Sequence, residues 1–257
     1  MPTFIIMLQP YINHQFGGAI WRLEIDELSD TIFIEVRNDA EKQVNFSSVG
    51  LTTGKLNFSN LTTPERWLTG IEAAYDGVLL LHNYRSASGP AHKGLMAVDA
   101  LTGETLWSNY IYAFDHLTTS GPVLYDTNFH PKKLFLADVK TGATSRIYEP
   151  FIYPELQNNI IAPQVINPEN LLANLFPAPP FGNSVHYLEY NNFRIVSLHT
   201  LQSGLLKQYL FVMDDINKVY EDLLNTDIQK LQPEAFILHK NRLIYIKNKA
   251  VLTILSL

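Results

Sequence analysis

Short apolar runs of four to eight residues recur along the chain, and each is bounded by Gly, Pro, Asp or Asn. Runs of this length that are rich in β-branched, aromatic and leucine residues indicate β-strands. The clearest of them are residues 31–37, 76–82, 121–125 and 185–190. The pattern predicts an all-β fold.

A longer unit recurs four times: a strand, a Thr-Gly or Ser-Gly turn, and a second strand. The fullest copy, residues 94–107, reads Gly-Leu-Met-Ala-Val-Asp-Ala-Leu-Thr-Gly-Glu-Thr-Leu-Trp. The turn glycines are spaced 49, 39 and 62 residues apart, at Gly54, Gly103, Gly142 and Gly204. A four-stranded propeller blade occupies about 40 to 50 residues. The repeats therefore predict one β-propeller domain over residues 1–257.

The turn residues have a structural explanation. Each turn glycine follows Thr or Ser and ends a strand, so we expect a tight turn that needs a positive φ. Asp99 and Asp138 lie four residues before their glycines, where a carboxylate can accept backbone N–H groups and cap the turn. We therefore interpret both aspartates as structural and not as catalytic acids.

Counting the strands predicts five blades. Residues 19–23, Ala-Ile-Trp-Arg-Leu, are similar to the end of the fullest repeat, so we expect them to pair with residues 251–255 and close the ring. Six blades is the alternative, because the stretch 148–183 is long enough to contain one more. Its many prolines favour an irregular insertion, since proline cannot donate to a strand ladder. Long loops often carry function, so this insertion is the first place to look for a site.

One segment departs from the β pattern. Between residues 214 and 230 apolar residues recur at helical spacing, and Asp214 and Asp215 occupy the positions of an N-cap and a first-turn acid. We expect one amphipathic helix there, packed on the rest of the fold.

The repeat ending at Trp107 resembles that of the PQQ-like (quinoprotein-like) β-propeller family, Ala-Leu-Asp-Ala-x-Thr-Gly-x-x-x-Trp. The match is partial in the other copies, where Phe58, Arg146 and Lys207 lie at or near the tryptophan position. The resemblance implies that Trp107 docks on a neighbouring blade's backbone, and that Trp21 does the same.

The resemblance also bears on activity. The family's enzymes use pyrroloquinoline quinone, calcium, adjacent cysteines and eight blades, whereas this chain has no cysteine and only 257 residues. It therefore implies a noncatalytic bacterial member. Noncatalytic relatives scaffold protein assemblies or bind ligands on the propeller face.

The composition restricts the classes of binding partner. The chain has 25 Asp and Glu and 19 Lys and Arg, and this net charge of −6 gives no general attraction to nucleic acid or anionic membranes. No apolar stretch approaches the roughly 18 residues that would span a bilayer. The start of the chain lacks a signal-peptide pattern. We expect a cytoplasmic protein without a cofactor.

A glycoside hydrolase is the second possibility. A five-bladed glycosidase would gather carboxylates from different blades in the central funnel, and the candidates are Asp26, Asp76 and Asp126, with Glu72 and Asp115 beside them. Turn capping explains Asp76 and Asp126 equally well.

The eight histidines show no HxH or HExxH spacing, so no metal site is predicted. Several of them read as ordinary strand-end or funnel residues: His82, His116, His130 and His186.

Two functions thus stay open. The first is a noncatalytic β-propeller scaffold that binds a protein or small ligand on its face, with no enzymatic activity. The second is the hydrolase. Clustered carboxylates in an open pocket would favour the hydrolase, and a filled centre would favour the scaffold.

Overall fold

The computed structural model describes residues 7–145, 148–167, 179–214 and 217–257. The chain divides into two compact units, which we describe separately. The central unit is Gly17–Asn158, and the terminal unit combines Met1–Phe16 with Asn159–Leu257. The described residues form strands and one 3-10 turn, so the all-β prediction is confirmed. None of their helical segments is long or apolar enough to cross a membrane.

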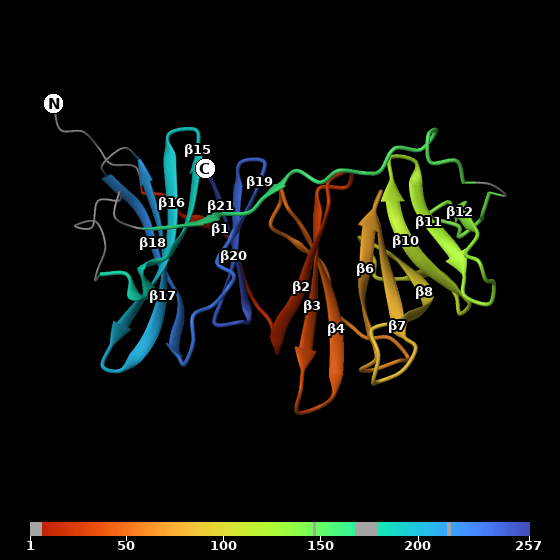
Figure 1. Cartoon of the computed structure of the whole chain (residues 1–257), viewed down its shortest axis with the longest axis horizontal. Coiled ribbons are helices and arrows are strands. Elements are labelled where there is room, and N and C mark those ends of the chain that lie inside the picture. Colours follow the sequence, from red (N-terminus) through yellow and green to blue (C-terminus); the bar gives the residue numbers. More distant parts are fainter. Residues whose placement is uncertain (1–6, 146–147, 168–178, 215–216) are drawn as a thin grey trace. The chain divides into compact units, whose positions relative to one another are not determined.

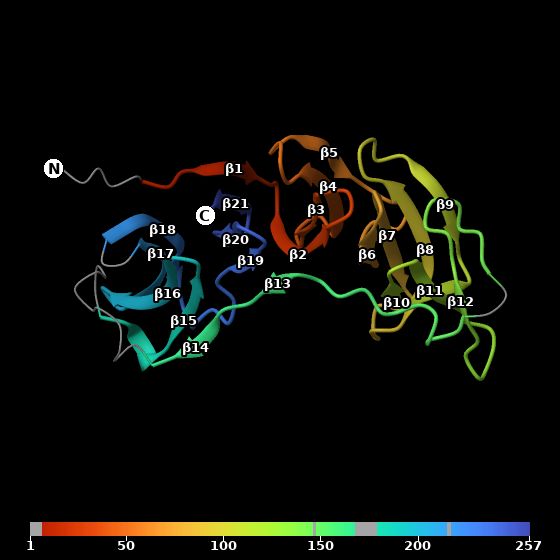
Figure 2. The same ribbon diagram turned by 90° about the horizontal axis from the view of Figure 1, so that it is seen from above.

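The central unit contains three antiparallel sheets (Figures 1 and 2). The first holds β2 (Ala19–Asp26), β3 (Thr31–Asn38), β4 (Gln43–Gly50) and β5 (Leu56–Leu61). The second holds β6 (Thr69–Tyr75), β7 (Val78–Tyr84), β8 (His92–Asp99) and β9 (Thr105–Asn109). The third holds β10 (Tyr112–Thr118), β11 (Gly121–Asp126) and β12 (Leu134–Leu136). Each sheet follows chain order, which suits connections by short hairpins.

Strand β7 shows why the sheets stack. Its Leu79 and Leu81 belong to the core shared with Phe33 and Phe46 of the first sheet. Its Val78 and Leu80 pack on the other face, in a core that includes Val139 beyond β12. Because successive side chains of a strand point to opposite faces, a strand buried on both sides needs an unbroken apolar run. That requirement accounts for Val-Leu-Leu-Leu in this strand.

Gly54, Gly103 and Gly204 lie between consecutive strands, and Gly142 lies between the bridged residues Ala137 and Thr144. All four have positive φ, at 66°, 75°, 81° and 71° respectively. The two aspartates cap their turns. Asp99 Oδ1 accepts the N–H groups of Leu101 and Thr102, and Asp138 Oδ1 accepts those of Lys140 and Thr141. Burial by itself would raise the pKa of Asp99, but these hydrogen bonds outweigh it and the pKa lies below its ordinary value.

Aromatic side chains connect the first and second sheets of the central unit to a turn of the following sheet. Phe58 in β5 lies against Gly103, and Trp107 in β9 lies against Gly142. The Trp107 indole also donates from Nε1 to the carbonyl of Val139 at 2.7 Å. A Cβ at Gly142 would come within 2.8 Å of the Trp107 ring. Glycine therefore meets two needs there, the backbone conformation and the ring's approach.

The terminal unit contains two antiparallel sheets (Figure 1). One holds β14 (Gln164–Ile166), β15 (Val185–Tyr190), β16 (Phe193–Gln202), β17 (Leu205–Asp214) and β18 (Asn217–Ile228). The other runs in the order β1 (Pro10–Gln15), β21 (Val251–Ser256), β20 (Arg242–Lys247), β19 (Ile237–His239) and β13 (Ile160–Ile161). Leu210 and Val212 of the first sheet share a core with Leu243 and Leu255 of the second.

The prediction of which strand completes the last sheet is wrong. Residues 19–23 lie in β2 and pair with β3, from Ala19 opposite Arg37 to Leu23 opposite Ile34. The strand that pairs with β21 is β1, with Ile12 opposite Ile254. Ile12 is the one apolar residue that β1 buries, at 1% exposure, so this edge strand gives almost no hydrophobic signal.

The predicted helix at 214–230 is also wrong, and residues 215–216 lie outside the described part. Residues 217–228 form the long strand β18, paired with β17. The pairing shifts register at three places. A β-bulge changes which face the following side chains occupy, so buried residues stop alternating and imitate a helical period.

The Pro-rich stretch 148–183 is partly ordered into strands. It supplies β13 and β14, each at the edge of a sheet, and the 3-10 turn Phe181–Asn183. Residues 168–178 lie outside the described part. An edge position is where a proline-rich segment can pair without interrupting a ladder.

We expect the stability of the terminal unit to depend on pH through His199. This β16 residue is 3% exposed, and its Nε2 accepts the N–H of Gln232 at 3.0 Å. Burial, helped by nearby His186, lowers the pKa of His199 to about 4. The unfolded chain then binds a proton that the native chain does not between about pH 6.5 and 4, so stability is lost as pH falls through that window.

The expected loss is about 2 kcal/mol. Urea unfolding followed by circular dichroism at pH 7 and pH 4.5 measures it, with His199→Gln as the control whose stability should change less over the same range. Equal pH dependence in the two proteins would contradict this assignment.

A candidate functional site on strands β6 to β8

Three side chains from consecutive strands of the central unit meet at one end of the second sheet. Glu72 comes from β6, His82 from β7 and His92 from β8. We call these three residues the Glu72 cluster. One possible donor atom from each lies within 4.8 Å of the others. This is the one group of three such residues found in the part of the chain that the structure describes.

Two β-bulges position the cluster. Ile71 lies opposite Leu81 and Ala73 opposite Leu80, so Glu72 is the extra residue of a bulge in β6. The β7–β8 pairing shifts beside His82, at Gly94, whose φ is +80°. Bulges re-aim side chains and are frequent beside functional sites. Here they direct a carboxylate and an imidazole toward each other.

The two imidazoles share one carboxylate oxygen. Glu72 Oε2 lies 2.8 Å from His92 Nδ1 and 3.2 Å from His82 Nδ1. The two rings are stacked, with centroids 3.5 Å apart and planes 8° from parallel. Tyr84 meets both rings edge-on, at 4.8 Å from His82 and 5.2 Å from His92. The tyrosine thereby holds the stack in place from one side.

His82 is buried without a well-formed hydrogen bond. Its side chain is 3% exposed, and neither Nδ1 nor Nε2 has a hydrogen-bond partner among the described residues. The contact with Glu72 at 3.2 Å is close enough for an ion pair but lacks hydrogen-bond geometry. A buried polar group without a partner costs about 1–3 kcal/mol, so such a group needs an explanation.

Charged pairs surround the cluster. Arg22 donates to Glu24 at 2.9 Å and to the carbonyls of Ile71 and Glu72. Arg37 donates to Glu35 at 2.7 Å, and the other oxygen of Glu35 accepts the N–H of Ile71. These contacts fix the backbone of β6 at Ile71 and at the bulge residue Glu72.

The carboxyl groups of Glu24 and Glu72 have pKa values shifted in opposite directions. Burial raises the pKa of Glu24 above its usual value in spite of Arg22. Burial acts in the same sense on Glu72, but contacts with His82 and His92 outweigh it and the pKa of Glu72 is lowered. The two histidines thus favour the ionised form of Glu72.

A stack of aromatic and cationic side chains adjoins the cluster. The Arg37 guanidinium lies 5.4 Å from the centroid of the Trp21 ring and 5.2 Å from that of Trp67, and Lys42 lies 4.7 Å from Trp67. Trp21 is the bulge residue of β2 and is 68% exposed. It therefore does not dock on a neighbouring sheet as Trp107 does, because it stands in the first strand of its sheet instead of the last.

A comparable but smaller arrangement occurs in the third sheet. Asp115 is the bulge residue of β10 and lies 2.9 Å from His116 Nδ1 and 3.3 Å from Lys132. His116 Nε2 lies 2.7 Å from the hydroxyl of Tyr148. This pair offers one carboxylate and one imidazole, compared with one carboxylate and two imidazoles in the Glu72 cluster.

The three aspartates predicted for a hydrolase each belong to a turn. Asp26, 2% exposed, accepts hydrogen bonds from Leu28 N, Ser29 Oγ and the N–H of Gly77. Asp76 precedes that glycine in the β6–β7 turn with a φ of 47°. Asp126 ends β11 and accepts the N–H of Asn128. The turn hydrogen bond links Asp26 to the backbone beside Asp76, whereas no hydrogen bond or ion pair among the described residues joins Asp126 to either.

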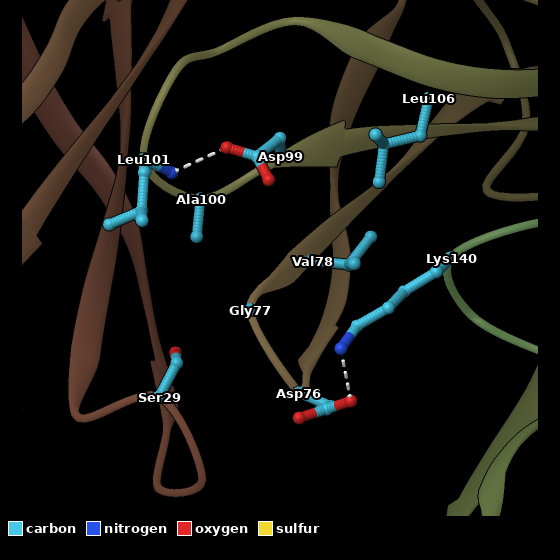
Figure 3. A pocket seen from close by; sticks show the side chains of 9 residues that line it. All are labelled: Ser29, Asp76, Gly77, Val78, Asp99, Ala100, Leu101, Leu106 and Lys140. Carbon is cyan, nitrogen blue, oxygen red and sulfur yellow. Dashed lines mark hydrogen bonds and ion pairs between the residues drawn. The ribbon is translucent and has the colours of Figure 1, made fainter.

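Asp76 also borders a surface pocket of about 350 Å³ over these turns (Figure 3). Figure 3 shows Lys140 reaching across it to Asp76, where the ion pair is 2.7 Å long. Asp99 lines the pocket too, but its carboxylate is directed at the N–H of Leu101. The hydrogen bond and charge of Asp76 raise the pKa of Lys140. The acids here are engaged by the turns and by the lysine.

The sequence analysis did not predict His82 and His92 as site residues. The one feature of the sequence that could have indicated the cluster is the equal spacing of ten residues from Glu72 to His82 and from His82 to His92. A hairpin that turns at Asp76-Gly77 places Gly70 opposite His82, and the next hairpin places Leu95 opposite His82. Recognising the cluster would have required locating both bulges.

Comparisons with known proteins add little about function. A domain of unknown function, DUF4905, matches residues 25–107, which is less than half of the chain and includes Glu72, His82 and His92. No curated protein matches the sequence.

Several solved structures are similar at low identity. BamB from Moraxella catarrhalis is 12% identical, with 97% of this chain and 100% of that one covered and a TM-score of 0.38. The β-propeller domain of the Trilobed protease from Pyrococcus furiosus is 9% identical, covering 92% and 64%, with a TM-score of 0.33. Raptor from Chaetomium thermophilum is 10% identical, covering 98% and 29%, with a TM-score of 0.31.

This chain spans less than two thirds of the last two proteins. Because every TM-score is below 0.5, no conclusion rests on these similarities.

Proposed function

We propose that this chain is a noncatalytic binding module built from propeller-type repeats, and that the Glu72 cluster is its ligand site. In this proposal the five sheets are the blades, and the chain is a single domain of the PQQ-like type. The cytoplasmic location and a protein or small-molecule ligand on one face belong to the same proposal.

The repeat contacts support the scaffold half of the proposal. Phe58 packs on Gly103, and Trp107 repeats this contact one sheet later by packing on Gly142. A rigid framework made of such contacts is what holds binding residues at fixed positions.

The single observation that carries the ligand site is the buried imidazole of His82, whose two ring nitrogens form no hydrogen bond in the described part of the chain. A fold that keeps a polar ring at 3% exposure, stacked on a second imidazole and facing a carboxylate, bears a cost that a bound ligand would offset.

The hydrolase alternative receives less support. A glycosidase needs two carboxyl groups that flank a sugar, one of them free to act as an acid. Asp26, Asp76 and Asp126 are engaged as turn acceptors or in an ion pair. Glu24 and Glu72 are neighbours, but Arg22 engages the first and two histidines engage the second.

Thermal unfolding with separate ligand classes tests the proposal. We expect one class among divalent metal ions, phosphate, small carboxylates and oligosaccharides to stabilise the wild type by about 3 kcal/mol at a hundredfold excess over its Kd. For a protein of this size that raises the Tm by roughly 6–12 °C.

Two variants accompany the screen. His92→Gln should abolish the shift, and His116→Gln, which alters the carboxylate–imidazole pair of the third sheet, should keep it. The ligand site is contradicted if no class stabilises the protein, or if the shift survives in His92→Gln. A panel of aryl glycosides tests the claim that the chain is noncatalytic. If the purified chain hydrolyses one of them and Glu72→Gln abolishes this turnover, the protein is a hydrolase instead.

A further inference from the structure

We infer that the ligand of the Glu72 cluster is a divalent transition-metal ion, held by one ring nitrogen each of His82 and His92 and by the Glu72 carboxylate. This inference rests on the proposal that the cluster is the ligand site, and it names the chemical class of that ligand.

The donor set fits such an ion. Two imidazoles and one carboxylate are the protein ligands of several catalytic zinc sites, and the same three donors bind Fe²⁺ in other proteins. Ca²⁺ and Mg²⁺ prefer oxygen donors, so two imidazoles disfavour them. The donor atoms, already within 4.8 Å of one another, come from three adjacent strands of one sheet. Strands position ligands more exactly than loops do.

The local charge favours a cation. Arg22 is paired with Glu24 and Arg37 with Glu35. Each of these two arginines is matched by a glutamate, whereas Glu72 forms no ion pair with a lysine or arginine in the described part of the chain, and its carboxylate contacts the two histidines. A bound cation would compensate the Glu72 carboxylate in a largely buried setting, where Coulomb interactions are strong.

A bound ion would also use the buried ring of His82. Neither ring nitrogen of His82 forms a hydrogen bond in the described part of the chain. The ring is stacked on that of His92 at 3.5 Å, and its Nδ1 lies 3.2 Å from Glu72 Oε2, so the ring can join the other two donors around one ion.

The cluster has a fixed side and an adjustable side. His82 is held by Tyr84, and its backbone carbonyl accepts the hydroxyl of Thr69 at 2.9 Å. The side chain of His92 is 31% exposed and borders solvent. Because parallel rings do not direct their lone pairs at one point, His92 must turn when the ion binds. Its exposure provides both that freedom and the entry path.

Titration with Co²⁺, followed by its visible absorption, and with Zn²⁺, followed by calorimetry, tests the inference on the full chain without a histidine tag. We expect one equivalent to bind per chain, with ligand-field bands typical of mixed nitrogen and oxygen donors. His92→Gln and Glu72→Gln should each weaken binding at least tenfold. His116→Gln should bind as the wild type does.

His82→Gln alters a buried residue and could fail to fold, so His92→Gln, at the solvent border, is the deciding variant. Binding that survives in both His92→Gln and Glu72→Gln overturns the metal site, and so does binding that His116→Gln abolishes. If neither ion binds while phosphate, a carboxylate or a sugar stabilises the protein in a manner that depends on His92, the metal inference fails and the proposed binding function stands.

Discussion

Replacing Gly142 with alanine is expected to destabilise the central unit by about 3 kcal/mol. The φ of +71° costs an L-residue about 1–2 kcal/mol. The new Cβ would also lie 2.8 Å from the Trp107 ring, which is held by its hydrogen bond to Val139. Overpacking of this kind costs about 1–3 kcal/mol. All three tryptophans belong to the central unit, so urea unfolding followed by tryptophan fluorescence measures this effect.

The chain contains a matched control for this substitution. Gly204 has a φ of +81°, but nothing lies within 4 Å of the position its Cβ would occupy. Gly204→Ala should therefore cost only the backbone strain, about 1–2 kcal/mol, and because Gly204 lies in the terminal unit, which contains no tryptophan, urea unfolding followed by circular dichroism measures it. In a Trp107→Ala background, Gly142→Ala should approach that smaller value, since the coupling between contacting residues is then removed. Equal costs for Gly142→Ala with and without Trp107 would show that the ring contact has no role.

Asp26→Ala should cost between about 2 and 4 kcal/mol. Asp26 is 2% exposed, and its Oδ2 accepts both Ser29 Oγ and the N–H of Gly77 at 2.6 Å. Hydrogen bonds to a charged acceptor contribute about 1.5–3 kcal/mol, and the donors left behind are partly buried. The bond to Gly77 joins the first sheet to the second, so its loss weakens the contact between sheets. Urea unfolding followed by tryptophan fluorescence again provides the measurement.

Asp126→Ala is the matched comparison. Asp126 is less buried and caps a single N–H within its own loop, so its removal should cost below about 1 kcal/mol. If Asp26→Ala proved as mild as Asp126→Ala, the inter-sheet role of Asp26 would be refuted. A triple substitution of Asp26, Asp76 and Asp126 cannot serve as an activity test, because the loss of Asp26 alone perturbs the scaffold.

The sequence predicted those parts of the fold that depend on local chemistry. Thr-Gly turns and the aspartates four residues before them are visible because one short segment contains both the donor groups and the acceptor. The strand β7 is equally visible, since burial on both faces produces an unbroken apolar run.

Features set by pairing were harder to predict. Strand β1 buries only Ile12, so its pairing with β21 leaves almost no trace in the apolar pattern. In β18 the register shifts disguise a strand as a helix. Trp21 looked equivalent to Trp107 because both end a similar apolar run, but the two residues lie in different strands of their sheets.

The candidate site escaped prediction for the same reason. The sequence places Glu72 only beside the carboxylates predicted for a hydrolase, and it presents His82 as an ordinary strand-end or funnel residue. Each bulge moves a side chain by one position relative to regular pairing. Without the bulges at Glu72 and Gly94, the spacing of ten residues from Glu72 to His82 and His92 carries no meaning.

The pairing of β1 with β21 affects the order in which the chain can mature during translation. Asn13 and Thr253 are partners across nearly the whole length of the sequence, whereas Gly17–Asn158 is contiguous. Domains generally fold as they leave the ribosome, N-terminal parts first. Strand β1 must therefore wait until β21 has been synthesised, and until then its exposed edge depends on its own polar composition for protection.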